Sequence, residues 1–548
     1  MIGLYQEHRS HSISDLRTQL QEDTKTLDQV RDAYAHYAVM TGDADGCLVG
    51  TRENVVSQVM DWVVAANRQN VLWLRSMPGA GKSTIARTIV RRLKDGKRHG
   101  ANFVFSRDDV ERRTPFALWC HILYSLSCRF PAFKRAAATQ LRDNRFEIGS
   151  SNAEDILNIV IQTISSLPDD EIAPDELPVI VIDALDECPR YSSLVANPRQ
   201  SVLDAISKWS KLSSLFKIIV TSREDADIWK VLGDEKSAYS IHLHTGSDVD
   251  EHSSRDIRHF LRRSLSERLD PTESDLENLS HRAAGLFVWA STAVSFILGR
   301  GGWAPQRFER ILKYESPGQR SDELSKLYHI LLTEEFTQDP DDLIRFAFRC
   351  VIGTIVVAAT PLTQSEIVDL LVGRQAPYPL EKGAIDNILE RIQMLTSSRT
   401  SVSQVIRFSH QSFSEFLLHP NFRHQFYSID SGKSESYLAA RCLAMMNTEL
   451  RSHMLLARPS NAYSAGEITQ EHISPSLRYA VQYWATHLTK SAPMEMLNVL
   501  QVFFDEHLLQ WLEIMGILGY MHRAIKMLRI VVSWLQVCIN TVKFDVFL

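Results

Sequence analysis

Residues 71–84 read VLWLRSMPGAGKST, and this stretch decides the fold. A short apolar run leads into a glycine-containing turn, and Lys82 and Ser83 then open an expected helix. Glycine suits such a turn because backbone N–H groups can converge on phosphate oxygens without interference from side chains, and the helix N-terminus adds positive potential. The pattern therefore predicts a phosphate-binding loop for a nucleoside triphosphate.

Each residue type in the loop has an expected task. Lys82 is expected to reach the β- and γ-phosphates, and Ser83 is expected to hold Mg²⁺. The full set of expected nucleotide-binding residues in this loop is Pro78, Gly79, Ala80, Gly81, Lys82, Ser83 and Thr84.

One position departs from the pattern G-x-x-x-x-G-K-[ST], because Ser76 stands where the first glycine is expected. Residues 78–81 keep the inner turn, so we expect an altered entry to the loop with binding retained. The alternative is an ordinary strand-turn-helix that binds nothing. Lys-Ser at this spacing after an apolar strand argues against that alternative.

A second apolar run, residues 177–182, ends in the acidic segment DALDE at residues 183–187. The run lacks periodicity, which is typical of a strand buried on both faces. At its tip, Asp183 is expected to hold Mg²⁺ through water. Either Asp186 or Glu187 is expected to polarise the water that attacks the γ-phosphate.

A third apolar run, residues 216–222, is followed by Arg223, which is a candidate sensor of the γ-phosphate. An arginine after a strand is usually only solvated, so this signal is weak by itself. The three runs together predict an α/β fold with a doubly wound parallel sheet, in which the strand ends converge on one ligand.

Composition limits the classes of function. With 548 residues, 44% of them apolar, the chain is long enough for several packed domains. The net charge of −6 and the lack of long basic runs argue against nucleic-acid binding. The longest apolar stretch, residues 285–299, is too short to insert into a membrane. Seven scattered cysteines without CxxC pairs indicate reduced thiols and a cytoplasmic protein.

The chain changes character along its length. Residues 12–40 have a helical pattern that we expect to pack on the following domain, with a self-associating coiled coil as the alternative. Strands then alternate with helices, as a parallel sheet requires, and the remainder is mostly helical. We expect an N-terminal helical segment, a P-loop NTPase domain, a helical lid, a winged-helix domain and a C-terminal helical domain, at residues 1–46, 47–246, 247–338, 339–430 and 431–548.

Further segments accompany the two nucleotide motifs. They are CLVGTR at 47–52, FVFSR at 103–107, TSR at 221–223, AGLFVWA at 284–290, PL at 361–362, HQSF at 410–413, YA at 479–480, YW at 483–484 and HL at 487–488. With these segments, residues 47–545 resemble the fungal NACHT-type signal-transduction NTPases of the STAND class. That class is related to the nucleotide-oligomerisation receptors of animals and to the AAA-like module of nephrocystin-3-like proteins.

The resemblance implies a closed, ADP-bound monomer that exchanges to ATP, opens and oligomerises. It assigns residues 47–246 to a NACHT domain and places His410 on the β-phosphate of ADP as a latch between domains. From the residues alone, a histidine between a strand and a helix is most often a polar cap. Ser76 and Ala184, which replace glycines common in the family, are expected to change the hydrolysis rate without abolishing binding.

Such proteins usually carry a C-terminal sensor of ankyrin or propeller repeats and often an N-terminal effector domain. Neither is visible in this sequence, so we expect a switch whose detector and output are missing, minimal or supplied by another polypeptide. Its expected partners are the nucleotide, further copies of itself in the ATP state, and an unidentified effector or sensor protein.

Three hypotheses for function follow. The first is a nucleotide-dependent switch that binds ATP or ADP with Mg²⁺, with GTP as an open alternative, and hydrolyses slowly. The second is a turnover ATPase of the AAA type, and the third is a scaffold that does not hydrolyse. Steady-state turnover separates them, because it is fast for a motor, very slow for a switch and absent for a scaffold.

Overall fold

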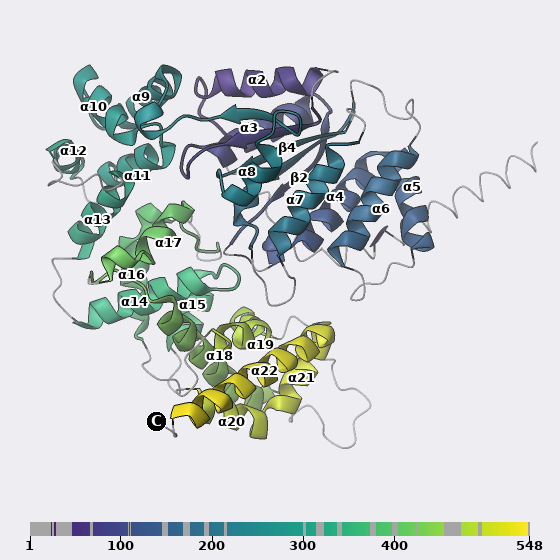
Figure 1. Cartoon of the computed structure of the whole chain (residues 1–548). Helices are drawn as coiled ribbons and strands as arrows, with labels where there is room; N and C mark the ends of the chain where they lie inside the picture. Colours follow the sequence, from purple (N-terminus) through teal and green to yellow (C-terminus); the bar gives the residue numbers. More distant parts are fainter. Residues whose placement is uncertain are drawn as a thin grey trace, which may run out of the picture. The chain divides into compact units, whose positions relative to one another are not determined.

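The computed structural model divides into two compact units, Met1–Pro317 and Gly318–Leu548 (Figure 1). Most of the expected helix at residues 12–40 lies outside the described residues. The structure describes Thr24, Leu27, Asp28 and residues 46–545, without residues 66–68, 108, 110, 145–151, 168–175, 191–196, 213–215, 300–302, 314–322, 337–341, 373–379, 397–403, 424, 454–472 and 491–495.

The first unit is built around a five-stranded sheet in which all neighbouring strands are parallel. The strand order is β2-β3-β4-β1-β5, so β4 lies between β1 and β3. The strands are β1 (Val71–Arg75), β2 (His99–Val104), β3 (Val179–Asp183), β4 (Lys217–Ser222) and β5 (Tyr239–His242). The expected α/β parallel sheet of a P-loop NTPase, followed by a helical region, is confirmed.

Helices cover both faces of the sheet (Figure 1). In β1, Leu72 and Leu74 join the core formed with α2 and α3, while Val71 and Trp73 join the core on the opposite face. Burial on both faces explains why the strands read as continuous apolar runs. The helices are α2 (Glu53–Val64), α3 (Lys82–Asp95), α4 (Pro115–Arg129), α5 (Pro131–Asp143), α6 (Ala153–Ser166), α7 (Pro198–Trp209) and α8 (Ala226–Leu232).

Two features near α5 add to the sequence analysis. The helix itself was not expected; it begins at Pro131, immediately after α4, because proline is accommodated in a first helical turn. From the N-terminal segment, Leu27 is buried in the same core as Phe133 of α5, and Lys134 donates a 2.8 Å hydrogen bond to Thr24. At least this part of the segment packs on the sheet domain.

Four further helices complete the first unit, namely α9 (Glu251–Leu265), α10 (Glu273–Ala283), α11 (Phe287–Ile297) and α12 (Ala304–Lys313). Gly285 joins α10 to α11 with a φ of +83°, and a Cβ there would approach the carbonyl oxygen of His244 to 2.8 Å. Glycine is therefore required at this junction. Across the described part of the chain, no helix combines the length and apolar character that crossing a membrane demands.

The second unit is helical. Within its described residues, residues 404–408 form two isolated antiparallel bridges, Thr363 with Val405 and Thr396 with Phe408. The winged-helix assignment stays a prediction. The helices are α13 (Glu323–Phe336), α14 (Asp342–Val357), α15 (Gln364–Val372), α16 (Lys382–Arg391), α17 (Gln411–Leu417), α18 (Ser431–His453), α19 (Pro475–Leu488), α20 (Leu497–Glu506), α21 (Leu508–Ile517) and α22 (Met521–Asp545).

A buried polar chain ties three parts of the second unit together. The Tyr479 hydroxyl accepts a 2.9 Å hydrogen bond from the backbone N–H of Ala359 and lies 2.8 Å from Nε2 of His487. The other ring nitrogen of His487 bonds the carboxylate of Glu435, which also pairs with Lys490 at 2.7 Å. Because buried polar groups are costly without partners, this chain specifies how α18 and α19 meet the end of α14.

In the first unit, a buried lysine holds the end of α2. The ammonium group of Lys217, the first residue of β4, donates to the carbonyl oxygens of Trp62, Val63 and Ala65 at 2.6, 3.1 and 2.6 Å. It also lies 4.7 Å from the centroid of the Trp62 ring. The last carbonyl groups of a helix lack intrahelical partners and carry partial negative charge, so the lysine satisfies and neutralises them.

We predict that Lys217→Met lowers the free energy of unfolding by about 2 to 3 kcal/mol, because buried carbonyl groups lose their charged donor. Urea denaturation followed by circular dichroism measures the change. The control is Lys208→Met, which removes a largely exposed lysine 3.4 Å from Glu154 and should cost less than about 1 kcal/mol. Equal effects of the two substitutions would contradict the capping role.

Candidate nucleotide-binding site

The loop between β1 and α3 has the backbone that phosphate binding requires. Gly79 and Gly81 have φ values of +84° and +97°, in the left-handed region that favours glycine. Gly81 precedes α3, and no side chain caps the first turn of this helix, which includes Lys82, Ser83 and Thr84. Backbone N–H groups at the start of α3 are thus not committed to a side-chain cap.

The serine that replaces the first glycine causes no strain. Ser76 has no positive φ, so a Cβ is tolerated there, and its hydroxyl donates a 3.0 Å hydrogen bond to the carbonyl of Met77. The backbone N–H of Ser76 bonds the carbonyl of Ser222 at the end of β4. The entry to the loop is therefore held to the sheet.

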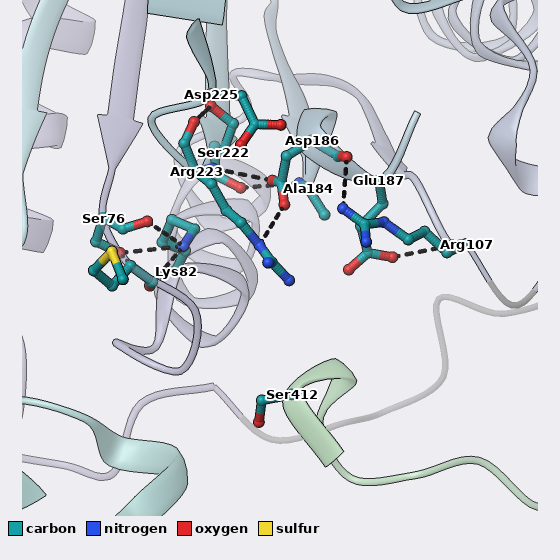
Figure 2. Close-up of polar contacts among 12 residues, drawn as sticks. Ser76, Lys82, Arg107, Ala184, Asp186, Glu187, Ser222, Arg223, Asp225 and Ser412 are labelled. Atoms are coloured by element: carbon teal, nitrogen blue, oxygen red, sulfur yellow. Dashed lines mark hydrogen bonds and ion pairs between the residues drawn. The ribbon is translucent and has the colours of Figure 1, made fainter. Parts of the chain in front are cut away.

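Lys82 lies folded against this loop entry (Figure 2). Its ammonium donates to the carbonyl oxygens of Ser76 at 2.9 Å and Met77 at 3.0 Å, and to the Ser76 hydroxyl at 3.2 Å. Burial lowers the pKa of Lys82 to about 8, although Asp186 and Asp183 oppose the shift. Anionic phosphates close to this ammonium would favour its charged form.

Asp183 and Ser83 meet at the end of β3. The carboxylate of Asp183 is buried and accepts hydrogen bonds from the hydroxyl groups of Thr221 and Ser83. Burial raises the pKa of Asp183, while these two hydrogen bonds and the nearby Arg87 and Lys82 lower it. Sequence analysis assigned the same two residues, Ser83 and Asp183, to Mg²⁺.

This pair has the right chemistry for Mg²⁺. A carboxylate and a hydroxyl are hard oxygen ligands, and Mg²⁺ generally takes few ligands from the protein and completes its shell with water and phosphate oxygens. Among the described residues there is no group of three or more His, Cys, Asp or Glu side chains suited to a metal.

Asp186 and Glu187 have different surroundings, although sequence analysis left them as alternatives. Asp186 is buried and accepts from both the guanidinium and the backbone N–H of Arg223, at 2.9 and 3.1 Å. Glu187 is half-buried, and its carboxylate accepts a 3.1 Å hydrogen bond from the backbone N–H of Arg107 (Figure 2). Arg223, the candidate phosphate sensor, is thus paired with one of the two candidate bases.

A further arginine, Arg199 of α7, holds the turn that carries these carboxylates. Its buried guanidinium donates to the carbonyl oxygens of Asp186 and Cys188 and pairs with Asp225 at 2.7 Å. In the same turn, Ala184 has a φ of +57°, which is unusual for a residue with a Cβ. Sequence analysis missed Arg199, because an arginine in the first turn of a helix gives no signal of burial.

Arg52 links the loop to the helices after β5. Its guanidinium donates to the Ala80 carbonyl at 2.9 Å and to the Ser253 hydroxyl at 2.6 Å, and it stacks 5.0 Å from the centroid of the Phe287 ring. Its backbone N–H bonds Asp256 at 2.9 Å. Burial lowers the pKa of Arg52, opposed by Asp256 and Asp250. Arg52 lies within the segment CLVGTR, whose sequence gives no sign of this role.

A second contact joins the loop to the same helical segment. The backbone N–H of Val288, in the first turn of α11, donates a 3.1 Å hydrogen bond to the carbonyl of Gly79. Two carbonyl groups of the loop, those of Gly79 and Ala80, therefore bond residues outside the loop. The loop conformation depends on α9 and α11 as well as on the sheet.

His410 belongs to the second unit, where it caps α17. Its Nδ1 accepts from the backbone N–H of Ser412 at 3.1 Å and lies 2.7 Å from the Ser412 hydroxyl. The polar-cap reading is therefore observed. A phosphate contact would have to use Nε2, and the proposed latch stays a prediction.

Several solved structures are similar to this chain at low identity. No curated protein matches the chain. Among solved structures, the Walker-type ATPase of Pyrococcus abyssi is 14% identical, with 68% of this chain and 98% of that chain covered and a TM-score of 0.34. A Pyrococcus horikoshii STAND protein with a tetratricopeptide repeat sensor is 13% identical, with 90% and 60% covered and a TM-score of 0.39.

A third structure, the ORC2 protein of Aeropyrum pernix in ADPNP-ADP complexes, is 10% identical, with 67% and 92% covered and a TM-score of 0.30. These identities and TM-scores are too low to carry an argument about function. The family model described as Nephrocystin 3, N-terminal, matches residues 50–223, a range that includes the loop, the acidic segment 183–187 and Arg223. The chain has a P-loop NTPase fold, and its residues 50–223 are similar to the nephrocystin-3 N-terminal family.

Proposed function

We propose that this chain is a nucleotide-dependent switch of the STAND class, which binds ATP or ADP with Mg²⁺ and hydrolyses ATP slowly. The observation that carries the proposal is the convergence of Lys82, Ser83 and Asp183 beside a glycine-shaped loop. The loop amides and Lys82 would hold the phosphates, and Ser83 and Asp183 would hold Mg²⁺. Bound Mg²⁺ would neutralise charge on the phosphate oxygens.

Glu187 is the better candidate of the two for orienting the attacking water. Its carboxylate is half-buried, whereas Asp186 is buried in its pair with Arg223. A base must be reached by water, and a half-buried carboxylate is more accessible to water than a buried one. Asp186 holds the guanidinium of Arg223 through Nε, so a γ-phosphate that attracted Arg223 would also act on this ion pair.

The switch is favoured over a plain ATPase because the loop is bonded to elements outside the sheet. Arg52 connects Ala80 to α9, and Val288 connects Gly79 to α11. A change in loop geometry on nucleotide exchange would therefore shift the helices that are bonded to the loop. A switch needs contacts of this kind, which differ between its two nucleotide states. His410, as a latch on the β-phosphate of ADP, would extend this coupling to the second unit. Oligomerisation in the ATP state completes the proposal.

We predict that Lys82→Ala weakens binding of Mg-ATP and Mg-ADP by roughly a hundredfold, because it removes the charged donor to the phosphates. Isothermal titration calorimetry measures both affinities. Lys94→Ala, near the far end of the same helix, is the matched control and should leave them unchanged. Unaltered affinity in the Lys82 variant would remove the phosphate-loop assignment.

We predict that Glu187→Gln keeps ATP binding but slows single-turnover hydrolysis by at least about a hundredfold, because orientation of the water is lost. Asp186→Asn is the comparison, and it should disturb Arg223 and lower thermal stability. Rapid-quench assays with radiolabelled ATP measure the rates. Normal hydrolysis in the Glu187 variant, together with loss in the Asp186 variant, would move the role to Asp186.

We predict that His410→Leu speeds ADP release by about ten- to a hundredfold and increases the open or oligomeric fraction, because one charge-assisted contact between domains is lost. Stopped-flow release of a fluorescent ADP analogue and size-exclusion chromatography measure the two effects. His419→Leu is a matched control, since His419 also accepts from a backbone N–H, that of Asn421, through Nδ1. If both variants had the same ADP release rate and the same oligomeric fraction, His410 would act only as a helix cap. The preference for a switch over a motor or a scaffold would then lose this support.

A further inference from the structure

The last helix, α22, packs on the second unit through only part of its apolar surface. Ala524, Met527 and Val531 are buried, and α22 contacts α19 and α21. These three residues follow the spacing of one helical face. They account for the attachment of α22 to the unit.

A second apolar row runs along α22 beside the first. Met521, Ile525 and Val532 are 44%, 50% and 53% exposed, and Leu528 and Leu535 are half-buried. The five residues are spaced alternately by four and three positions, which is the spacing of a seam between two helices. At about 100° per residue, the row covers about 80° of the helix surface and adjoins the buried face. The apolar surface of α22 is thus wider than the unit covers.

Basic side chains flank this seam. His522, Lys526 and Arg529 lie on the side of the seam away from the buried face, and α22 has no acidic residue before Asp545. Among the described residues, neither Lys526 nor Arg529 has an ion-pair partner. Arg523 instead donates a 3.1 Å hydrogen bond to the side-chain oxygen of Gln482, and its guanidinium lies 5.2 Å from the centroid of the Tyr520 ring.

We propose that the seam formed by Met521, Ile525, Leu528, Val532 and Leu535 is a docking site for an amphipathic helix of another protein, whose apolar row is flanked by Asp or Glu. The alternating spacing of the seam is suited to packing against a helix. The positive charges of Lys526 and Arg529 favour acidic residues on that partner helix. A second copy of α22 would bring the same positive charges together. A bilayer surface suits a wider apolar face than this one.

The test uses the full chain and a designed peptide of about four heptads, with Leu at a and d and Glu at e and g. Repulsion between glutamates keeps this peptide from pairing with itself. The comparison peptide has Lys at e and g. Fluorescence anisotropy should show binding of the Glu peptide at least about tenfold tighter than binding of the Lys peptide, with a preference that decreases at high salt.

Two double variants locate the site. Ile525→Asp with Val532→Asp should weaken binding of the Glu peptide by at least about tenfold, whereas Val64→Asp, at a 67% exposed valine of α2, should not. Lys526→Glu with Arg529→Glu should shift the preference to the Lys peptide. Thermal melting followed by circular dichroism checks that each variant is folded.

Several results would overturn the proposal. Equal affinity for the two peptides, or unchanged binding in the Asp double variant, would remove the docking site. Binding to vesicles of phosphatidylserine and phosphatidylcholine without binding to the Glu peptide would assign the seam to a membrane surface. A dimer seen in sedimentation velocity that the Asp double variant abolishes would assign it to a second copy. None of these outcomes depends on nucleotide binding. The experiment therefore tests the docking site independently of the proposed switch function.

Discussion

The position of β4 between β1 and β3 is the constraint on which the candidate site depends. Parallel pairing places the carboxyl ends of all three strands at one edge of the sheet. Thr221, near the end of β4, donates from its hydroxyl to Asp183 and accepts from the backbone N–H of Ala184. The strand thereby fixes the acidic turn that follows β3. On its other side, the carbonyl of Ser222 bonds the N–H of Ser76 and holds the loop entry.

Two arginines hold the acidic turn at this edge of the sheet. Asp186 is paired with Arg223, and the backbone of the same turn is held by Arg199. An unpaired charge in such a place would be costly, so the arginines stabilise the turn as well as shaping its potential. Charges of both signs act on Lys82, because Asp186 raises the pKa of its ammonium group and Arg223 lowers it. Any ligand that attracts Arg223 would therefore also change the field at Lys82.

The loop is held from two sides, which has a consequence for dynamics. The sheet holds its entry through Ser76, and the helical segment holds its middle through Arg52 and Val288. Arg52 itself is bonded to Ser253 and Asp256 of α9. These bonds connect the loop directly to α9 and α11. A shift of the loop by a fraction of an ångström therefore has to be accommodated by these helices, and a shift of the helices by the loop. The same bonds that position the backbone of this loop make its conformation dependent on α9 and α11.

Local sequence alone determined the strands, the glycine loop and the acidic strand end, because each depends on neighbouring residues: burial on both faces gives apolar runs, and a left-handed turn needs glycine. The order of the strands and the different surroundings of Asp186 and Glu187 were decided by the tertiary structure. Arg52 and Asp256 are 204 positions apart, and Lys217 caps a helix about 150 positions earlier, so no local pattern reveals either contact. The sequence supplies the candidate polar groups, and long-range packing decides which partners each group has and how deeply it is buried.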